Sequence, residues 1–225
     1  MKAAAVIPAA GLGKRFGAQK QFLELAGKPL LIHTLQAFEE SASVSAVCIA
    51  APEAEIPAVR EMIARFPIKK VWAIVAGGKE RQDSVRLGFE ALPPCDIVVV
   101  HDGVRPLVTS EIIERTIQGA EKTGGCVAAL PVKETTKRVG ADRLIVETVD
   151  RESLWSIQTP QAFRASIFRR AVEKSVQDRF LGTDESMLVE RLGEKVQVVE
   201  GSPYNIKVTV PEDFKIAEAY LKMRI

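Results

Sequence analysis

The sequence lacks the features of a membrane-spanning or disulfide-linked protein. It contains no apolar run of the ~18 residues that a spanning helix needs. Three cysteines, Cys48, Cys95 and Cys126, are odd in number and lie far apart, and with only two histidines they show no zinc-ligand spacing. We therefore expect buried thiols in a reducing compartment and, since the first residues show no targeting signal, a cytoplasmic location.

An excess of charge of one sign is also missing. The chain has 31 Lys and Arg against 29 Asp and Glu, a formal charge of +2. Attraction of the whole molecule to nucleic acid or to a membrane surface is therefore weak, and we predict neither as a partner. Binding of an anion must depend on local clustering. Hydrophobic residues make up 47% and charged residues 27%, as in an ordinary folded domain.

Short apolar runs alternate with segments of helical spacing. The runs are 3–7, 44–51, 70–76, 96–102 and 126–132, and the helical segments are 29–40, 53–65, 80–91 and 110–123. This alternation predicts an α/β fold with a mostly parallel twisted sheet and helices on both faces. Ligands of such sheets bind beyond the carboxyl ends of the strands. The corresponding segments here are 8–20, 76–84 and 101–106.

The alternation of predicted strands and helices stops after residue 132. Residues 133–150, "KETTKRVGADRLIVETVD", contain two extended runs around "GAD", which predicts a projecting β-hairpin arm. Helices are expected near 164–177 and 184–192, strands at 195–201 and 205–210, and a last helix from Pro211. We interpret 1–225 as a single domain, with 133–153 as an arm.

The glycine-rich stretch "PAAGLGKRFG" follows the first strand. Gly17 comes one residue late for a dinucleotide fingerprint, and the chain has no Walker A motif, which weakens both of these nucleotide-binding interpretations. The backbone at Gly11 and Gly13 can approach an anion closely, while Arg15 and Lys20 supply positive charge. A triphosphate suits this combination. The alternative is a surface turn with solvated cations.

Eight motifs, in order, carry a resemblance to a known family. They are "PAAGLGKRFG", "KQF", "GGKERQDSV", "VHDGVRP", "VKETTKRV", "TVDRESLWSIQTPQAF", "TDE" and "NIKVT". The chain resembles the sugar and alditol nucleotidyltransferases and, more closely, the 2-C-methyl-D-erythritol 4-phosphate cytidylyltransferase family of the non-mevalonate isoprenoid pathway. The resemblance spans nearly the whole chain. It implies a Rossmann-like nucleotidyltransferase fold and a reaction that joins CTP and 2-C-methyl-D-erythritol 4-phosphate, with release of pyrophosphate.

The resemblance also implies roles for individual residues. The catalytic cations are Arg15, Lys20 and Lys207. The nucleotide-binding residues are Pro8, Ala9, Ala10, Gly11, Gly13, Gly78, Lys79 and Ser84. The substrate-binding residues are Asp102, Arg105, Thr136 and Arg151. Mg²⁺ or another divalent cation is expected mainly on the triphosphate, with Asp102 as the candidate ligand from the chain.

Each of these roles has a structural alternative. Ser84 would simply open a helix, and Asp102 would be a turn carboxylate paired with Arg105. Lys207 would be a solvated strand lysine, and a hairpin rich in Thr, Lys and Arg is often only a solvated edge ribbon. We interpret His101 as a packed strand-end residue rather than a base. Three aromatic residues are expected to pack the base of the arm or a dimer contact: Trp155, Phe163 and Phe168.

In the family the arm reaches the neighbouring subunit's site, which implies a homodimer. The chain departs from many relatives, which have a longer loop between the arginine and the lysine and alanines at Gly103 and Val104. Many also have aspartate at Lys79. Other readings stay open: a ribitol-5-phosphate or related alditol-phosphate nucleotidyltransferase, a catalytically idle nucleotide-binding regulator, and an NAD-dependent dehydrogenase. Against the dehydrogenase, no acid ends the second strand.

Overall fold

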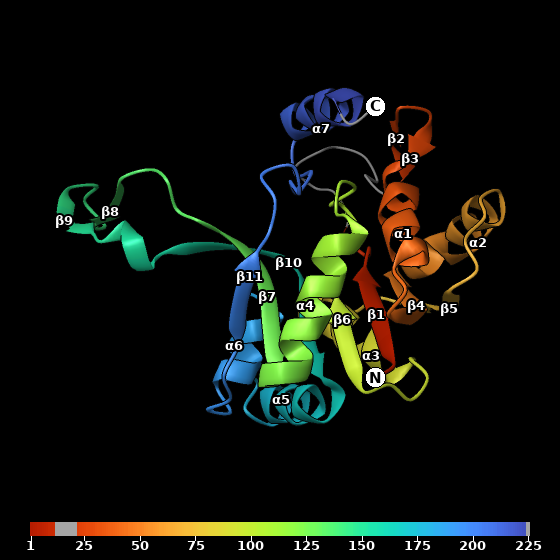
Figure 1. The fold of residues 1–225 in the computed structure, drawn as a ribbon, viewed down its shortest axis with the longest axis horizontal. Helices are drawn as coiled ribbons and strands as arrows, with labels where there is room; N and C mark the ends of the chain where they lie inside the picture. The colour runs from red at the N-terminus through yellow and green to blue at the C-terminus, as the bar shows by residue number, and fades with distance from the viewer. Residues whose placement is uncertain (12–21, 224–225) are drawn as a thin grey trace.

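A seven-stranded sheet forms the centre of the molecule (Figure 1). The computed structural model describes residues 1–11 and 22–223. The strand order is β11-β7-β10-β6-β1-β4-β5, and every neighbouring pair that excludes β10 is parallel. The strands are β1 (Ala3–Pro8), β4 (Val44–Ala51), β5 (Val71–Ala76), β6 (Ile97–Val100), β7 (Gly125–Pro131), β10 (Trp155–Arg164) and β11 (Gln197–Glu200). The predicted mostly parallel sheet is confirmed.

Helices cover both faces of this sheet. α1 (Leu30–Glu40), α2 (Ile56–Ala64) and α4 (Ser110–Thr123) contribute to the core on one face. α3 (Arg81–Glu90), α5 (Ala165–Gln177) and α6 (Glu185–Glu190) contribute to the core on the other. Neighbouring strand residues alternate between the two cores: Ile7 lies in the first and Val6 in the second. This alternation is why the strands are apolar throughout.

Strand β10 is the strand of the central sheet that the sequence pattern did not predict. It lies between β6 and β7 and is antiparallel to both. Polar Gln158, Thr159 and Gln161 interrupt its apolar pattern, yet all three are buried in the structure. Phe163, on β10, and Phe168, on α5, are fully buried and stacked on each other. The prediction that these two rings pack the arm or a dimer contact is therefore wrong. Trp155 begins β10 and is partly exposed.

The C-terminal part of the chain folds over the exits of the strands. α7 (Pro211–Met223) packs near the short hairpin of β2 (Glu24–Leu25) and β3 (Lys28–Pro29) in a third apolar cluster. The predicted strand at 205–210 is wrong, because this segment forms no sheet ladder. It is instead a loop, held by the Val208 N–H, which donates to the Val104 carbonyl at 2.9 Å.

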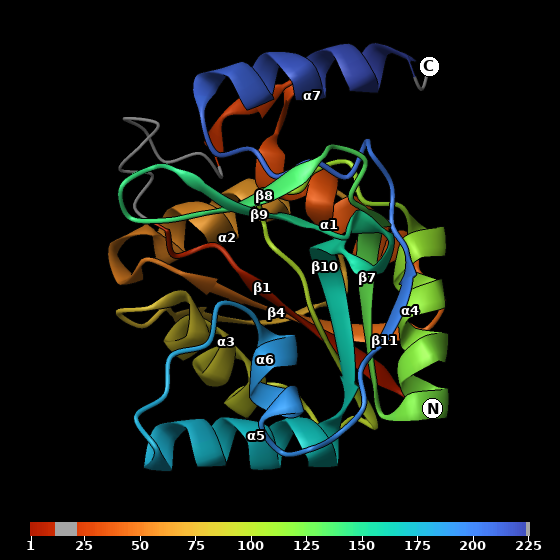
Figure 2. The ribbon, with the colours of Figure 1, turned by 90° about the vertical axis from the view of Figure 1, so that its left-hand side faces the viewer.

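The predicted arm is a two-stranded hairpin of β8 (Thr136–Val139) and β9 (Ile145–Val149), followed by the 3-10 turn η3 (Arg151–Ser153). It projects far from the body in Figure 1 and lies toward the viewer in Figure 2. Its exposed apolar side chains are Val139, Leu144, Ile145 and Val146. None of the helices in the described part of the chain has the length and hydropathy needed to cross a membrane.

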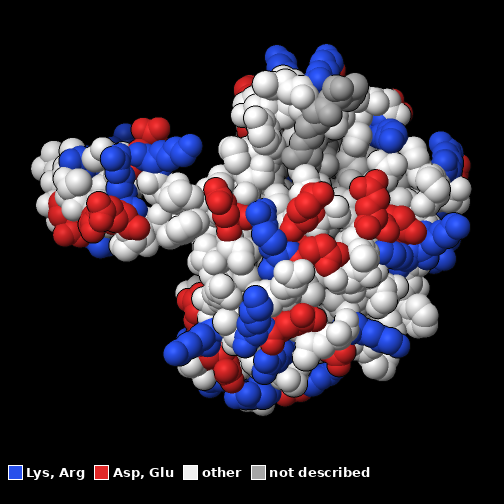
Figure 3. All heavy atoms as spheres, in the orientation of Figure 1, with Lys and Arg blue, Asp and Glu red and all other residues white. Residues whose placement is uncertain are grey.

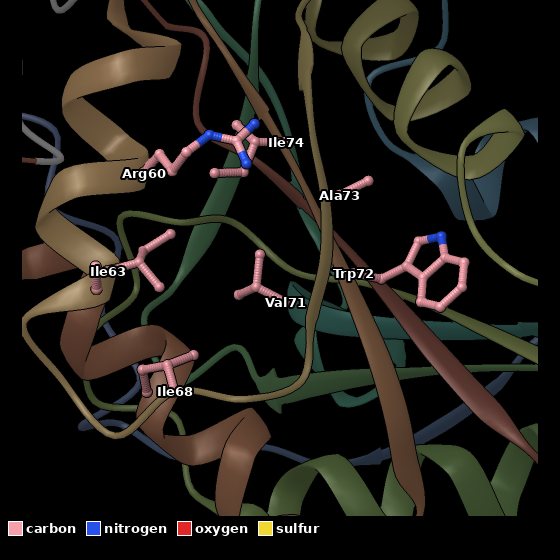
Figure 4. Close-up of a pocket in the computed structure, with 8 residues that line it drawn as sticks. Arg60, Ile63, Ile68, Val71, Trp72, Ala73 and Ile74 are labelled. Carbon is pink, nitrogen blue, oxygen red and sulfur yellow. The ribbon is translucent and has the colours of Figure 1, made fainter.

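The surface has mixed charge and a shallow pocket beside β5. On the face shown in Figure 3, cationic and anionic side chains are interspersed, in keeping with the low net charge. A shallow pocket of about 450 Å³ lies between α2 and β5, where Arg60, Ile63 and Trp72 are among its lining residues (Figure 4). It sits beside the sheet edge.

Candidate functional site

The parallel strands β1, β4, β5 and β6 all end on the same side of the sheet, at their carboxyl ends. The Gly103 N–H donates to the Pro8 carbonyl at 3.3 Å, and the Gly77 N–H donates to the Ala51 carbonyl at 2.8 Å. A Cβ added at Gly77 would lie 2.2 Å from the Ala10 Cβ, so only glycine allows this approach of the two loops. Residues 8–11 and the predicted segments 76–84 and 101–106 are therefore brought together, with Pro8, Ala9, Ala10, Gly11 and Gly78 among them.

Ser84 shapes the loop that precedes α3. Its hydroxyl accepts from the Gly78 N–H at 3.0 Å and donates to the Glu80 carbonyl at 3.2 Å, and the residue is buried. Glu80 caps α3 through a reciprocal capping box with Asp83. These bonds hold the backbone beside Gly78 in one conformation. Lys79 is exposed at the tip of the same loop.

Asp102 is the centre of a charged cluster at the exit of β6. The residue is only 5% exposed. Its Oδ1 accepts from Arg81 Nε at 2.9 Å, and its Oδ2 lies 2.9 Å from Lys207 Nζ and 3.5 Å from Arg105 Nε. The structure thus brings together three residues that the resemblance singled out, Asp102, Arg105 and Lys207, which lie far apart in the sequence.

The loop that carries Lys207 is fixed on both sides of that residue. The Asn205 side-chain amide donates to the Thr159 carbonyl at 2.8 Å, and the Asn205 backbone carbonyl accepts from Arg105 Nη1 at 2.7 Å. Val208 is fully buried in the third apolar cluster. Lys207 between them turns toward Asp102, with its side chain 39% exposed. A lysine so held is partly open to solvent and available to an incoming anion.

Two charged residues of this cluster were not assigned a role from the sequence. Arg81 donates to Asp102, and its Nη1 donates to both oxygens of Glu185, at 2.7 and 2.9 Å. Glu185 is 1% exposed. Both residues stand inside motifs that carry the resemblance, "GGKERQDSV" and "TDE". The motifs marked both residues, but the sequence does not show that the two side chains form an ion pair.

The cluster contains two carboxylates and three cations, and their pKa values reflect this mixture. Burial alone would raise the pKa of Asp102, but Arg81, Lys207 and Arg105 together hold it well below its usual value. Burial raises the pKa of Glu185, and Arg81 offsets only part of that shift. Burial also opposes the charge of Arg81, but the two carboxylates raise its pKa overall. Asp102 therefore stays ionised throughout the neutral range.

His101 is a neutral structural residue. Burial lowers its pKa to about 3. Its Nε2–H donates to the Arg105 carbonyl at 3.3 Å, so Nδ1 accepts from the Thr159 hydroxyl at 3.0 Å. The same hydroxyl accepts from the Asp102 N–H at 3.1 Å. His101 thus holds the Asp102 turn against β10, which agrees with its interpretation as a packed residue and not a base.

This neutrality predicts a pH dependence of stability. Below pH 6.5 the unfolded chain protonates His101 and the folded chain does not until about pH 3, so stability contributed by this group falls as the pH falls. The free energy of unfolding of the native chain should exceed that of His101→Gln by an amount that shrinks by up to about 1.4 kcal/mol per pH unit between pH 6 and 4. Urea unfolding at each pH measures it; a constant difference would contradict the prediction.

The arm residues lie apart from this cluster in a single chain. The Thr136 hydroxyl donates to the Glu134 carbonyl at 3.3 Å, and Arg151 Nη1 donates to the Lys133 carbonyl at 2.6 Å. Both belong to the projecting arm, which Figure 1 shows far from the exits of β1 and β6. Gly13, Arg15 and Lys20 lie outside the described residues.

The donor set near Asp102 is suited to a divalent cation held mainly by a substrate. Within residues 1–11 and 22–223, no group of three or more His, Cys, Asp or Glu side chains could hold a metal ion by itself. Both oxygens of Asp102 face cations, and both oxygens of Glu185 accept from Arg81. One carboxylate beside a bound phosphate would fit Mg²⁺, which commonly takes one or two carboxylates together with phosphate oxygens and waters.

The comparison with protein families and curated proteins agrees with the resemblance. The model of the 2-C-methyl-D-erythritol 4-phosphate cytidylyltransferase family (IspD) matches residues 3–223. Curated proteins of that name from Geotalea uraniireducens and Halalkalibacterium halodurans are 47% and 48% identical. The first match covers 99% of this chain and 97% of the relative, and the second 98% and 97%. These names favour methylerythritol phosphate over the ribitol phosphate alternative.

Solved structures show the same fold. The 4-diphosphocytidyl-2C-methyl-D-erythritol synthase of Anaerococcus prevotii superposes with a TM-score of 0.88 at 31% identity, covering 98% of this chain and 96% of that one. The cytidylyltransferase of Thermus thermophilus superposes with a TM-score of 0.81 at 32% identity, covering 99% and 100%. With the fold, the Asp102 cluster and the full-length match in agreement, this chain belongs to the 2-C-methyl-D-erythritol 4-phosphate cytidylyltransferase family.

Proposed function

We propose that the strand-exit site of this chain catalyses the cytidylyl transfer of its family. CTP and 2-C-methyl-D-erythritol 4-phosphate give 4-diphosphocytidyl-2-C-methyl-D-erythritol and pyrophosphate, by direct in-line attack of the acceptor phosphate on the α-phosphorus. The observation that carries the proposal is the position of Lys207. A lysine with a partly exposed side chain is held at a buried aspartate beside the converging exits of β1, β5 and β6.

The reaction needs positioned charge more than it needs a proton acceptor. A phosphate monoester has a second pKa near 6, so the acceptor is largely dianionic at pH 7 and attacks without a base. The main obstacle is repulsion between two polyanions, together with charge that develops on the oxygens of the α-phosphorus. The site suits this task, because His101 is neutral and buried and the cluster of Asp102 holds an excess of cations over carboxylates.

Each residue then has a defined task. Lys207, held at Asp102 Oδ2, faces the reacting phosphate and stabilises its developing charge. Asp102 and Arg105 hold the acceptor and keep Lys207 in place. The backbone of 8–11 and of Gly78 binds the nucleotide, with Ser84 supporting that loop and Lys79 near it. Arg15, Lys20 and Gly13 are proposed, on the resemblance, to complete the triphosphate cradle.

A divalent cation, Mg²⁺ or another, is proposed to accompany the triphosphate. When bound, it neutralises part of the phosphate charge. Asp102 is the residue that would contribute a ligand from this chain, because its carboxylate lies beside Lys207, which is proposed to face the phosphates. The phosphates and waters would supply the rest.

The test of the function is product formation. The purified chain is incubated with magnesium and each of the four ribonucleoside triphosphates in turn, with methylerythritol phosphate or ribitol phosphate as acceptor. Product mass and pyrophosphate release are measured. We expect product with CTP and methylerythritol phosphate. Product with ribitol phosphate at an equal rate, or none with any pair, would overturn the proposal.

We also propose that the chain is one nucleotidyltransferase domain whose arm, 133–153, serves a homodimer. Four apolar side chains on a hairpin of only two strands are exposed to solvent, although such a hairpin is marginally stable by itself. Packing against a second copy would cover them. It would also deliver Thr136 and Arg151 to the partner's phosphate-binding site, where the guanidinium fork suits a phosphate.

Mixed dimers test this sharing of sites. Arg151→Ala and Lys207→Met are each nearly inactive as homodimers if both residues serve the reaction. In a heterodimer with shared sites, one site keeps both native residues and the other has neither. A randomised mixture should therefore recover about one quarter of native activity, because half of the dimers are mixed and each has one intact site. No recovery, or a monomer with full activity, would contradict the shared site.

A further inference from the structure

The motif "TDE", 183–185, has no role in the function described above. Its two acids do different things in the structure. Asp184 caps α6, accepting from the Met187 N–H at 3.0 Å, and it also accepts from the Gln161 side chain at 2.8 Å. It therefore anchors α6 to β10. Glu185, the first residue of α6, reaches across to Arg81 on α3.

Glu185 and Asp102 are the two ends of an acid–arginine–acid chain. Arg81 Nη1 donates to both oxygens of Glu185 at 2.7 and 2.9 Å, and Arg81 Nε donates to Asp102 Oδ1 at 2.9 Å. The guanidinium is planar and rigid, so fixing one side of it fixes the direction of the other. With Oδ1 taken by Arg81, the remaining oxygen, Oδ2, faces Lys207 and Arg105.

Stability by itself is a weak reason for such a pair. Removing two charges from water costs several kcal/mol per ion, and well-packed apolar residues often replace buried ion pairs without loss. The pKa of Glu185 is raised by its burial, which shows that ionisation here is opposed. Arg81, one partner of this buried pair, also bonds Asp102, which holds Lys207. The pair is therefore suited to fixing the geometry of the site.

We propose that Glu185 is a positioning residue, which acts through Arg81 to set the rotation of the Asp102 carboxylate and thereby the place of the Lys207 ammonium. Without Glu185, Arg81 is held at one end only, and Oδ1 and Oδ2 of Asp102 become free to exchange partners. Lys207 is then less well placed for the transition state. Binding of the nucleotide, which involves the backbone of 8–11 and of Gly78, should change little. This inference rests on the proposed function.

The experiment is a double-mutant cycle. Glu185→Gln, which keeps the shape of the side chain and removes its charge, is made in the native and in the Lys207→Met background. The melting temperature is measured for all four proteins. kcat and the KM for CTP are then measured at a temperature well below the lowest of these melting temperatures. The matched control is Glu190→Gln, an exposed glutamate at the other end of α6.

We expect Glu185→Gln to lower kcat about 10- to 100-fold in the native background, with the KM for CTP within about threefold. In the Lys207→Met background it should lower kcat less than threefold, because the group that it positions is absent. Glu190→Gln should change neither. An equal fall of kcat in both backgrounds, or a change in melting temperature alone, would overturn the inference.

Two further measures keep the outcome unambiguous. Where Glu185→Gln does not fold, Arg81→Lys enters the same cycle, because a lysine cannot bridge two carboxylates as a guanidinium does and should show the same dependence on Lys207. Failure of the proposed function is seen separately, as absence of product with the native chain. If kcat depends on Lys207 but not on Glu185, this inference is rejected and the proposed function stands.

Discussion

Replacing Lys207 by methionine should lower kcat by about 10²- to 10³-fold, the usual loss when one preorganised group that stabilises transition-state charge is removed. Methionine keeps much of the length of the side chain and removes its charge. The fold should survive, because the Lys207 side chain is 39% exposed and Asp102 keeps Arg81 and Arg105 as partners. Steady-state kinetics and thermal unfolding measure the two quantities.

The matched control for this change is Lys195→Met. Lys195 is an exposed lysine that precedes β11, in the same part of the sequence but without a place in the Asp102 cluster. It should keep native kcat. The assignment of Lys207 would be contradicted if kcat of Lys207→Met stayed within threefold of the native value, or if it fell only in proportion to a loss of folded protein.

Asp102→Asn should affect both turnover and stability. The amide keeps the shape of the carboxylate, but it leaves Arg81, Arg105 and Lys207 around a neutral group. Breaking a buried pair by removing one partner costs about 3–5 kcal/mol, so at pH 7 the free energy of unfolding should fall by about 3 kcal/mol. For a chain of this size that corresponds to a fall in melting temperature of roughly 6–12 °C. kcat should fall about 10²-fold or more, as Lys207 loses its anchor.

The stability effect of Asp102→Asn has a defined pH dependence. Because the folded pKa of Asp102 lies below its unfolded value, its contribution is complete above about pH 4 and is lost as the pH falls further. The difference between native and variant proteins should therefore be constant from pH 7 to pH 5 and shrink below pH 4. The control is Asp178→Asn, on an exposed surface ion pair, which should change little. Equal effects of both substitutions would contradict the central place of Asp102.

Most of the sheet could be predicted because each strand's pattern is local. Five apolar runs and four amphipathic segments appear in the structure within two residues of their predicted bounds, except that α2 begins three residues late, after a 3-10 turn at Glu53–Glu55. β10 could not be predicted this way. Its buried Gln158, Thr159 and Gln161 bond to loops distant in the sequence, including the Asp102 turn and the Asn205 loop. Sequence patterns assign a polar residue to the surface unless its hydrogen-bond partners are known.

The residues of the site were predictable in kind, but their associations were not. Asp102, Arg105 and Lys207 were singled out through the family resemblance, and the structure brings them into one cluster. Arg81 and Glu185 stood in quoted motifs without a role. The expected strand around Lys207 proved to be a loop, because Val208 bonds to the turn of Val104 and not to a neighbouring strand.

The sequence by itself determined the α/β class, the family and the cationic character of the strand exits, because apolar periodicity and short motifs are properties of neighbouring residues. Only the tertiary structure decided which charges share Asp102, since Arg81 and Glu185 are 104 residues apart and meet only when α3 and α6 pack on the same face of the sheet. The energy of an ion pair in a buried cluster depends on the distance between the charges and on the burial of their side chains. The order of residues in the sequence determines neither directly.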